Sequence, residues 1–238
     1  MEIQRVINFI NELSKNNNKI WFDNNKKEYI AVKKIIEEFT LKLIEEISKF
    51  DNSIKYLTAQ NCTYRINRDL RFSKDKIPYK THIGIFICPR GKKSPYAGYY
   101  FHLEANYSNS SNFLGRNEID SGVYCPDKKI LNGIRTAIVN EPIKFIEAIN
   151  KAIKTRGFYL SEYNSLKKVP NGFPKDTNYS NYLKLKNYCL TKPLSDEIIF
   201  SKDIIDITVD NFKQTFDFIT FLNKSIEFTI KKEKEIYF

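Results

Sequence analysis

The chain has 238 residues, of which 42% are hydrophobic and 28% charged, and its formal net charge is +11 at pH 7. A chain of this length buries roughly 70 to 75% of the surface of its unfolded form. The composition is typical of a soluble globular protein and excludes a disordered or membrane chain. Its longest apolar runs, such as "IGIFIC" at 83–88, are far shorter than the ~20 residues that span a bilayer, so we expect no membrane segment.

The N-terminal segment, "MEIQRVINFINELSK", is amphipathic and lacks both an apolar block and a small-residue cleavage site, so we interpret it as the first helix and not as a signal. The four cysteines are widely spaced and form no C-x-x-C pair. This pattern predicts small buried side chains in a reducing compartment, although Cys125 is also a candidate nucleophile. We therefore expect a cytoplasmic protein.

Apolar residues recur every three or four positions from about 24 to 50, which predicts a long amphipathic helix. Asn25 and Glu28 have the spacing of a capping box at its start. Trp21 and Phe22 precede this helix, and we expect them to anchor it as core residues.

The next region, from 61 to about 126, alternates apolar and polar residues and predicts strands and turns. Beyond it the pattern predicts helices at 126–139 and 141–153, a strand near 183–191, and a final helix through Phe212 and Ile230. No linker divides the chain. We expect one α+β domain over 1–238, an antiparallel sheet with long helices packed on it, with N-terminal helices in 1–50, the sheet region in 61–126, and helices plus one more strand in 127–238.

The positive charge is dominated by lysine, since only eight of the 39 basic residues are arginines. Most lysines lie among glutamates on predicted helices, where opposite charges support a solvated face. Three of the arginines, however, fall within seven positions of the segment "RINRDLRFSKDKIPYKTH" at 65–82. Arginine binds carboxylate or phosphate with two parallel hydrogen bonds, so this cluster predicts an anion site.

A straight strand would hold Arg65 and Arg71 ~20 Å apart, too far to share one phosphate. A bend near Arg68 would gather the three side chains around a compact site, and the lysines that follow would add charge. The alternative is an ion-pair ladder of Arg65, Asp69 and Arg71 on a sheet surface, an arrangement that adds little stability. The predicted ligand-binding residues of this segment are Arg65, Arg68, Asp69, Arg71, Lys74, Lys76 and Lys80.

Both histidines of the chain, His82 and His102, lie at the end of this segment or shortly after it. If the loop at 89–95 joins two strands in a hairpin, Gly84 faces Tyr100 and His82 faces His102. His102 is then either a structural residue or a proton donor or acceptor beside a bound anion, so His102 and Tyr100 are the catalytic candidates. The two histidines with Glu104 make an incomplete metal set, and we expect neither a metal nor a cofactor.

The segment "NFLGRNEIDSGVYCP" at 112–126 contains Gly115 and Gly122 and leads into the helix that carries Arg135. Its helix start is either a second anion contact or a simple strand-to-helix turn. On the first interpretation, Tyr124 and Arg135 join the ligand-binding residues.

Several stretches together resemble the uncharacterised bacterial and fungal family known as domain of unknown function 2461. They are "NNNKIWFDNNKKEY" (16–29), "YRINRDLRFSKDKIPYKTHIG" (64–84), "AGYYFHLE" (97–104), "SGVYCP" (121–126), "VPNGFPKD" (169–176) and "LKLKNYCLTKPLSDE" (183–197). The resemblance covers nearly the whole chain and marks, among others, Phe72 within the arginine run. It implies a single domain and no established activity, and the asparagine-rich loop at 105–120 departs from the short glycine-rich link of the family.

Two function classes follow from these patterns. In the first, the chain binds a small phosphate- or carboxylate-bearing ligand, with or without turnover, so enzymatic activity is left open. In the second, the same basic side chains form an exposed track for nucleic acid. The sequence predicts no membrane partner and does not determine the oligomeric state.

Overall fold

The structure is a computed structural model that describes residues 2–71, 73–104 and 117–236, with side chains described through Lys232. Helices and one five-stranded antiparallel sheet make up this part of the chain, which confirms the predicted α+β class. The strand order is β1-β2-β3-β5-β4. The strands are β1 (His82–Ile87), β2 (Gly98–Glu104), β3 (Glu118–Val123), β4 (Tyr159–Leu160) and β5 (Tyr188–Pro193).

Two compact units are interleaved along the sequence. Unit 1 comprises Met1–Ile87, Tyr100–Ile119 and Pro193–Val209, and unit 2 comprises Cys88–Tyr99, Asp120–Lys192 and Asp210–Phe238. The boundaries fall inside strands β2, β3 and β5. The units are therefore not two successive domains joined by a linker.

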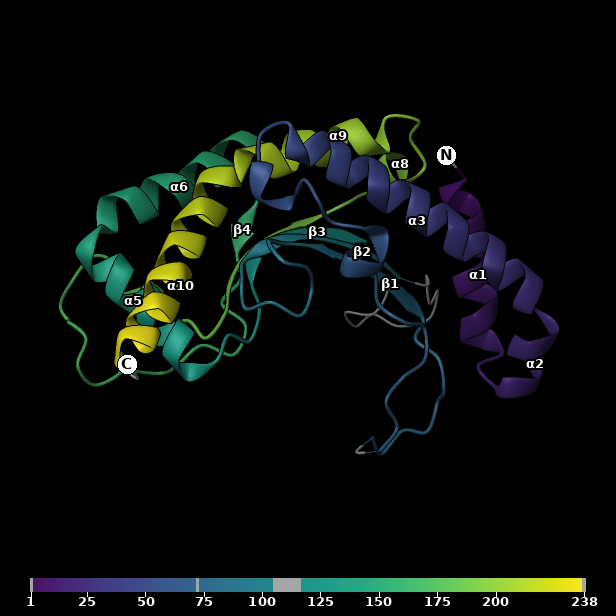
Figure 1. The fold of residues 1–238 in the computed structure, drawn as a ribbon, viewed down its shortest axis with the longest axis horizontal. Coiled ribbons are helices and arrows are strands. Elements are labelled where there is room, and N and C mark those ends of the chain that lie inside the picture. The colour runs from purple at the N-terminus through teal and green to yellow at the C-terminus, as the bar shows by residue number, and fades with distance from the viewer. Residues whose placement is uncertain (1, 72, 105–116, 237–238) are drawn as a thin grey trace. The chain divides into compact units, whose positions relative to one another are not determined.

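Unit 1 contains the N-terminal helices, drawn in purple and blue in Figure 1. They are α1 (Ile3–Lys15), α2 (Lys19–Asn24), α3 (Lys26–Ser48), the short 3-10 helix η1 (Asn52–Ile54) and α4 (Ala59–Cys62), and α8 (Asp196–Ile199) also belongs to this unit. Helix α3 covers strand β2, since the Phe39 and Phe101 rings lie 4.9 Å apart and are both buried. This contact anchors the predicted long helix on the sheet.

Helix α3 begins and ends within two residues of the predicted range. Asn25 is its N-cap residue, as expected, but the predicted capping box is wrong, because its side chain makes no capping hydrogen bond. The amide Nδ2 instead donates to the carbonyl oxygen of Trp21 at 2.8 Å. The side chain thus ties the new helix to the end of the preceding one.

Unit 2 is built around the buried Phe145 ring, which lies 5.3 to 6.0 Å from four other aromatic rings. Its helices are α5 (Lys128–Asn140), α6 (Pro142–Arg156), α7 (Ser180–Leu183) and α10 (Phe216–Ile236), whereas α9 (Ile204–Gln214) crosses the unit boundary. Pro142 begins α6, as predicted, at a position where its missing N–H costs nothing.

Three predicted elements differ from the structure. Strand β5 begins at Tyr188, because the first residues of the predicted strand close α7. The final helix is two helices, broken at Thr215, whose hydroxyl donates to the carbonyl oxygen of Phe212 or to Ser121 Oγ and competes with helical hydrogen bonding. Residues 63–71 form no strand and make only isolated bridges at Thr63 and Asn67.

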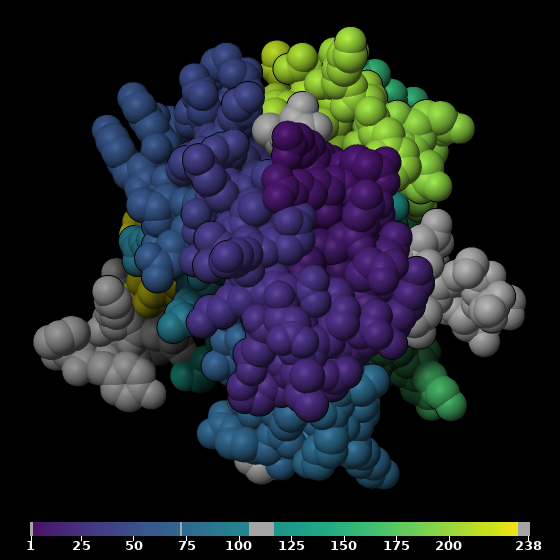
Figure 2. Space-filling view, turned by 90° about the vertical axis from the view of Figure 1, so that its right-hand side faces the viewer, coloured from purple at the N-terminus to yellow at the C-terminus, as the bar shows by residue number. Residues whose placement is uncertain are grey.

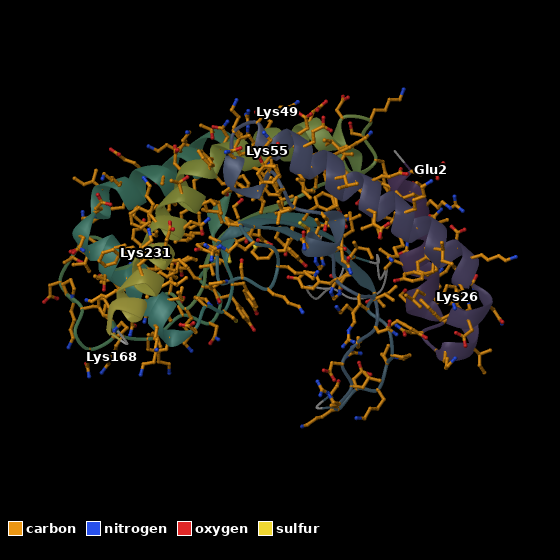
Figure 3. The ribbon with its side chains drawn as sticks, viewed as in Figure 1. Glu2, Lys26, Lys49, Lys55, Lys168 and Lys231 are labelled. Carbon is orange, nitrogen blue, oxygen red and sulfur yellow. The ribbon has the colours of Figure 1, made fainter. Side chains whose placement is uncertain are left out.

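The lysines labelled in Figure 3 are all exposed. Many others pair with a glutamate one turn away on their own helix, as in the Lys33–Glu37 and Lys231–Glu227 pairs. This agrees with the prediction of solvated helix faces. In the described part of the chain, no helix has the length and apolar character needed to cross a membrane.

Candidate anion-binding site and a tyrosine–histidine–glutamate chain

The arginine-rich segment folds back on itself in unit 1. The backbone N–H of Arg68 donates to the carbonyl oxygen of Pro78 at 2.9 Å, and that of Lys80 donates to Ile66 at 2.8 Å. Residues 65–71 and 73–80 thus lie on the two sides of an antiparallel hairpin, and the segment 65–80 is here called the basic hairpin. Its six basic and two acidic side chains give a net charge of +4.

The base of the basic hairpin is held by the N-terminal helices. The Asn17 side chain mimics a backbone group, since its Nδ2 donates to the carbonyl oxygen of Tyr79 at 2.9 Å and its Oδ1 accepts from the Tyr79 N–H at 3.1 Å. The buried Tyr79 ring also stacks on Phe22 with centroids 4.0 Å apart. Figure 2 shows the hairpin, in blue, directly below the purple N-terminal helices.

Two of the three arginines are neutralised within the hairpin. Arg68 donates to the Asp75 carboxylate at 2.7 Å, and Arg71 donates to both oxygens of Asp69 at 3.0 and 2.6 Å. These hydrogen bonds hold the pKa of Asp69 and of Asp75 below their ordinary values. The chain thus turns back beyond Arg68 and not at Arg68, where a bend was predicted. Arg68 and Arg71 bind separate carboxylates, and the Arg71–Asp69 pair is the one that the ion-pair alternative contained.

Arg65 and Lys80 lie together at the base of the basic hairpin. Lys80 Nζ donates to the carbonyl oxygen of Arg65 at 3.0 Å and sits 5.5 Å from the Tyr64 ring centroid. Partial burial, and next the Arg65 charge, lower the pKa of Lys80. Among the described residues, neither Arg65 nor Lys80 forms an ion pair with a carboxylate, and the Arg65 charge contributes only at longer range to lowering the pKa of Asp69, so this base remains net positive.

Lys74 and Lys76 occupy the far end of the hairpin, where both are exposed. Lys76 Nζ donates to the carbonyl oxygen of Leu70 at 3.1 Å and so closes the turn. The neighbouring Phe72, which the family resemblance marks, lies outside the described residues.

Strands β1 and β2 make the contacts predicted for the histidines. The His82 and His102 rings stack with centroids 5.1 Å apart, and the Tyr100 hydroxyl lies over Gly84, where an added Cβ would approach it to 2.6 Å. The Tyr100 hydroxyl contacts His102 Nδ1 at 2.9 Å, and His102 Nε2 contacts Glu104 Oε2 at 3.3 Å. The three side chains form one hydrogen-bonded chain along β2.

The charges of the basic hairpin act on His82, whose ring stacks on His102 of the hydrogen-bonded chain. Burial, and next the neighbouring His102, lower the pKa of His82 to about 4, and the charges of Lys80 and Arg68 contribute in the same direction. His82 is therefore neutral at physiological pH. In the described part of the chain, no group of three His, Cys, Asp or Glu side chains has the geometry of a metal site.

Tyr124 and Arg135, predicted as further ligand contacts, both belong to unit 2. Tyr124 is 68% exposed. Arg135 is buried, and its guanidinium donates to the carbonyl oxygens of Leu183 and Leu185 at 2.9 Å each. Arg135 thus provides hydrogen-bond donors for carbonyl groups at the end of α7 and two residues beyond it. Gly115 lies outside the described residues.

The cysteine prediction is only partly correct. Cys62 and Cys88 are buried, but Cys125 is exposed and its φ of 48° is in the left-handed region. The backbone N–H of Cys125 donates to the Asn187 side chain at 2.7 Å, which holds this conformation.

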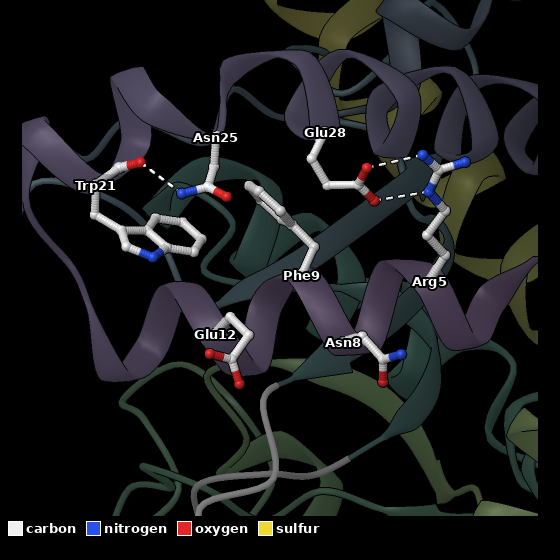
Figure 4. A pocket seen from close by; sticks show the side chains of 7 residues that line it. All are labelled: Arg5, Asn8, Phe9, Glu12, Trp21, Asn25 and Glu28. Atoms are coloured by element: carbon white, nitrogen blue, oxygen red, sulfur yellow. Dashed lines mark hydrogen bonds and ion pairs between the residues drawn. The ribbon is translucent and has the colours of Figure 1, made fainter.

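A separate pocket of about 330 Å³ lies between α1 and the α2–α3 corner (Figure 4). Arg5 donates to both oxygens of Glu28, at 2.7 and 2.8 Å, across this pocket. Trp21, predicted as core, is half-buried and forms one wall, whereas Phe22 is buried as expected. None of the predicted ligand-binding residues lines this pocket. It is lined by Arg5, Asn8, Phe9, Glu12, Trp21, Asn25 and Glu28.

The fold and the hairpin define an α+β protein with a basic hairpin clamped on its N-terminal helices. The family model described as "Conserved hypothetical protein (DUF2461)" matches residues 5–221, so the chain belongs to this family, as the resemblance indicated. Neither the search of curated proteins nor that of solved structures found a match.

Sequence reasoning did not single out Asn17 as the residue that clamps the hairpin. It lies in an asparagine-rich run that resembles an ordinary polar turn, and only the fold brings it to Tyr79, 62 positions later in the chain. The sequence pattern places Glu104 only in an incomplete metal set. Its two-residue spacing from His102 on one strand face was the available signal for a hydrogen-bonded chain.

Proposed function

We propose that the base of the basic hairpin binds a small anionic group, phosphate or carboxylate, beside the histidines of β1 and β2. The observation that carries the proposal is the positive charge at Arg65 and Lys80, neither of which forms an ion pair with a described carboxylate. By contrast, Arg68 and Arg71 hold internal carboxylates. Their role is to maintain the turn, because their charges are neutralised there.

Preorganisation supports this location. Asn17 and Phe22 fix Tyr79, which directly precedes Lys80, so the cationic side chains project from anchored backbone. A site that is ordered before binding loses less conformational entropy when the ligand arrives. Arginine also offers the planar, two-point contact that both candidate anions accept.

The test compares the base with the far end of the hairpin. Inorganic phosphate is added at constant ionic strength to wild type, Arg65→Ala, Lys80→Met and the matched control Arg71→Ala, and the unfolding temperature is measured. At 100 times Kd, a ligand stabilises the folded state by about 2.7 kcal/mol. For a chain of this size, that raises Tm by roughly 5 to 10 °C.

We expect Arg65→Ala and Lys80→Met to remove most of this stabilisation, whereas Arg71→Ala keeps it. Absence of a specific phosphate effect in wild type contradicts the proposal. Equal losses in all three variants also contradict it, because they place the interaction along the whole hairpin.

Nucleic acid binding is the second candidate function, favoured by the exposure of the basic side chains at the far end. The Arg71 side chain is 77% exposed, and Lys74 and Lys76 are exposed as well. Binding of a single-stranded oligonucleotide should then weaken with salt, and Lys74→Ala should reduce the slope of log K against log salt by about one. Lack of retention at low salt excludes this function.

A further inference from the structure

The hydrogen bonds among Tyr100, His102 and Glu104 determine which ring nitrogen of His102 carries the proton, and no ligand is needed for this. An ionised carboxylate only accepts hydrogen bonds, so the proton between His102 and Glu104 belongs to Nε2. In the neutral ring, Nδ1 then carries a lone pair, and the Tyr100 hydroxyl donates to it. Both ring nitrogens therefore have partners, and His102 itself has no nitrogen left for a ligand.

This arrangement has the order of a catalytic triad, with a tyrosine hydroxyl where other enzymes place a serine. In such triads a carboxylate orients a histidine, and the histidine accepts the proton of a hydroxyl. The side chains of His102 and Glu104 are only 15% and 12% exposed. Because they are shielded from water, their hydrogen bonds are stronger than those of a surface pair.

Gly84 makes this chain sterically feasible. An added Cβ at this position would lie 2.6 Å from the Tyr100 hydroxyl and 3.0 Å from its ring, so only glycine leaves room for the tyrosine in this position. The His82 ring stacks on the His102 ring. His82 belongs to the packing and not to the hydrogen-bonded chain.

We propose that Tyr100 is a catalytic residue and that His102 is its base, with Glu104 as the positioning residue. The phenolic oxygen donates its proton to His102 and keeps acceptor capacity toward a ligand. A water beside the bound anionic ester transfers a proton to the Tyr100 oxygen while the tyrosine proton moves to His102 Nδ1, and the water oxygen forms a bond to the phosphorus or acyl carbon of the ester. The bond from that atom to the leaving oxygen breaks, the leaving oxygen takes the proton from His102, and Glu104 stabilises the imidazolium formed in between.

The substrate class is therefore an anionic ester that water hydrolyses. This identity rests on the proposed function, because Arg65 and Lys80 would hold the anionic group. The activation of Tyr100 does not depend on the proposed anion site, because Tyr100, His102 and Glu104 form their hydrogen bonds without a bound ligand.

The first experiment measures the reactivity of Tyr100 in the absence of any anion. N-acetylimidazole transfers its acetyl group to phenolic oxygen and releases imidazole, and peptide mapping gives the rate at each tyrosine. Tyr56 is the internal reference because it is 89% exposed. We expect half-buried Tyr100 to react at least tenfold faster than Tyr56, and Glu104→Gln and His102→Gln each to reduce that rate at least tenfold without changing Tyr56.

The control is His82→Gln, which alters the ring stack but not the hydrogen-bonded chain, and we expect a change of less than twofold. A Tyr100 rate below that of Tyr56, or an equal loss in His82→Gln, overturns the proposal. Should His102→Gln fail to fold, ¹⁵N chemical shifts of the wild-type ring decide: protonated Nε2 with unprotonated Nδ1 supports the proposal, and the opposite tautomer refutes it. Neither readout depends on phosphate, so this proposal and the anion site fail independently.

Discussion

Replacing Gly84 by alanine tests the packing on which the Tyr100–His102 contact depends. The new Cβ would lie 2.6 Å from the Tyr100 hydroxyl oxygen, whereas an ordinary contact begins near 3.4 Å. The ring must therefore move by about 0.8 Å. Because the obstructing atoms are the end of a side chain, the ring can move at moderate cost, but the 2.9 Å hydrogen bond to His102 lengthens or breaks.

The free energy of unfolding should fall by about 2 kcal/mol. Overpacking a filled site costs typically 1 to 3 kcal/mol, and the lost hydrogen bond contributes about 1 kcal/mol of net stability, part of which relaxation recovers. For a chain of this size, 2 kcal/mol corresponds to roughly 4 to 8 °C in Tm. A Gly84→Ala effect of this size leaves the protein folded.

A double-mutant cycle with Tyr100→Ala separates this mechanism from a general effect of alanine on the strand. Once the tyrosine ring is absent, the added methyl group meets no obstruction, and Gly84→Ala should be neutral or stabilising by a few tenths of a kcal/mol. The coupling energy, measured by urea unfolding, should therefore be close to 2 kcal/mol. Equal destabilisation by Gly84→Ala in both backgrounds would refute the steric argument.

Three further predictions concern other positions. Gly122→Ala should reduce stability by more than about 3 kcal/mol, seen as loss of soluble protein or of the cooperative transition, because its φ is 145° and a Cβ would lie 1.8 Å from the carbonyl oxygen of Tyr188. Asn17→Ala leaves the Tyr79 N–H and carbonyl without their side-chain partner, which should cost about 2 kcal/mol of local stability. Trypsin should then cleave the basic hairpin about 30-fold faster. An unchanged cleavage rate would show that Asn17 does not hold the hairpin. His82 has a folded-state pKa of about 4, below the ordinary 6.5, so the unfolded state binds the proton at a higher pH than the folded state does. The free energy of unfolding should therefore fall by about 1 to 2 kcal/mol, after solvent screening, as the pH drops from 6.5 to 4. His82→Gln should flatten this pH dependence, measured by urea unfolding over the same interval.

The sequence predicted those parts of the fold that depend on local periodicity. Helix α3 and the Pro142 start of α6 follow from apolar spacing and from backbone chemistry within a few residues. The contact between the two histidines was also predictable, because strand alternation and a short loop determine which residues face each other.

The contacts of the arginines could not be predicted in the same way. The alternation of apolar and polar residues does not determine which carboxylate a guanidinium binds. Asp69 and Asp75 are both near enough in sequence to reach several arginines. The turn that brings Arg68 to Asp75 is set by backbone pairing with Pro78, and the clamp at Tyr79 comes from a distant segment. Long-range contacts of this kind carry no periodic signal.

The clamp and the hydrogen-bonded chain are parts of one arrangement within unit 1. Tyr79 is fixed by the N-terminal helices, and His82, three residues later, begins the strand on which Gly84 admits the Tyr100 hydroxyl. Loosening the clamp therefore changes the position of Lys80 and the entry of β1 together. Because the charges of Lys80 and Arg68 reach His82, a ligand that neutralises the base of the hairpin should also raise the pKa of His82, and titrating its ring protons by NMR with and without phosphate measures that shift. An unchanged His82 titration despite phosphate binding would place the anion elsewhere on the protein.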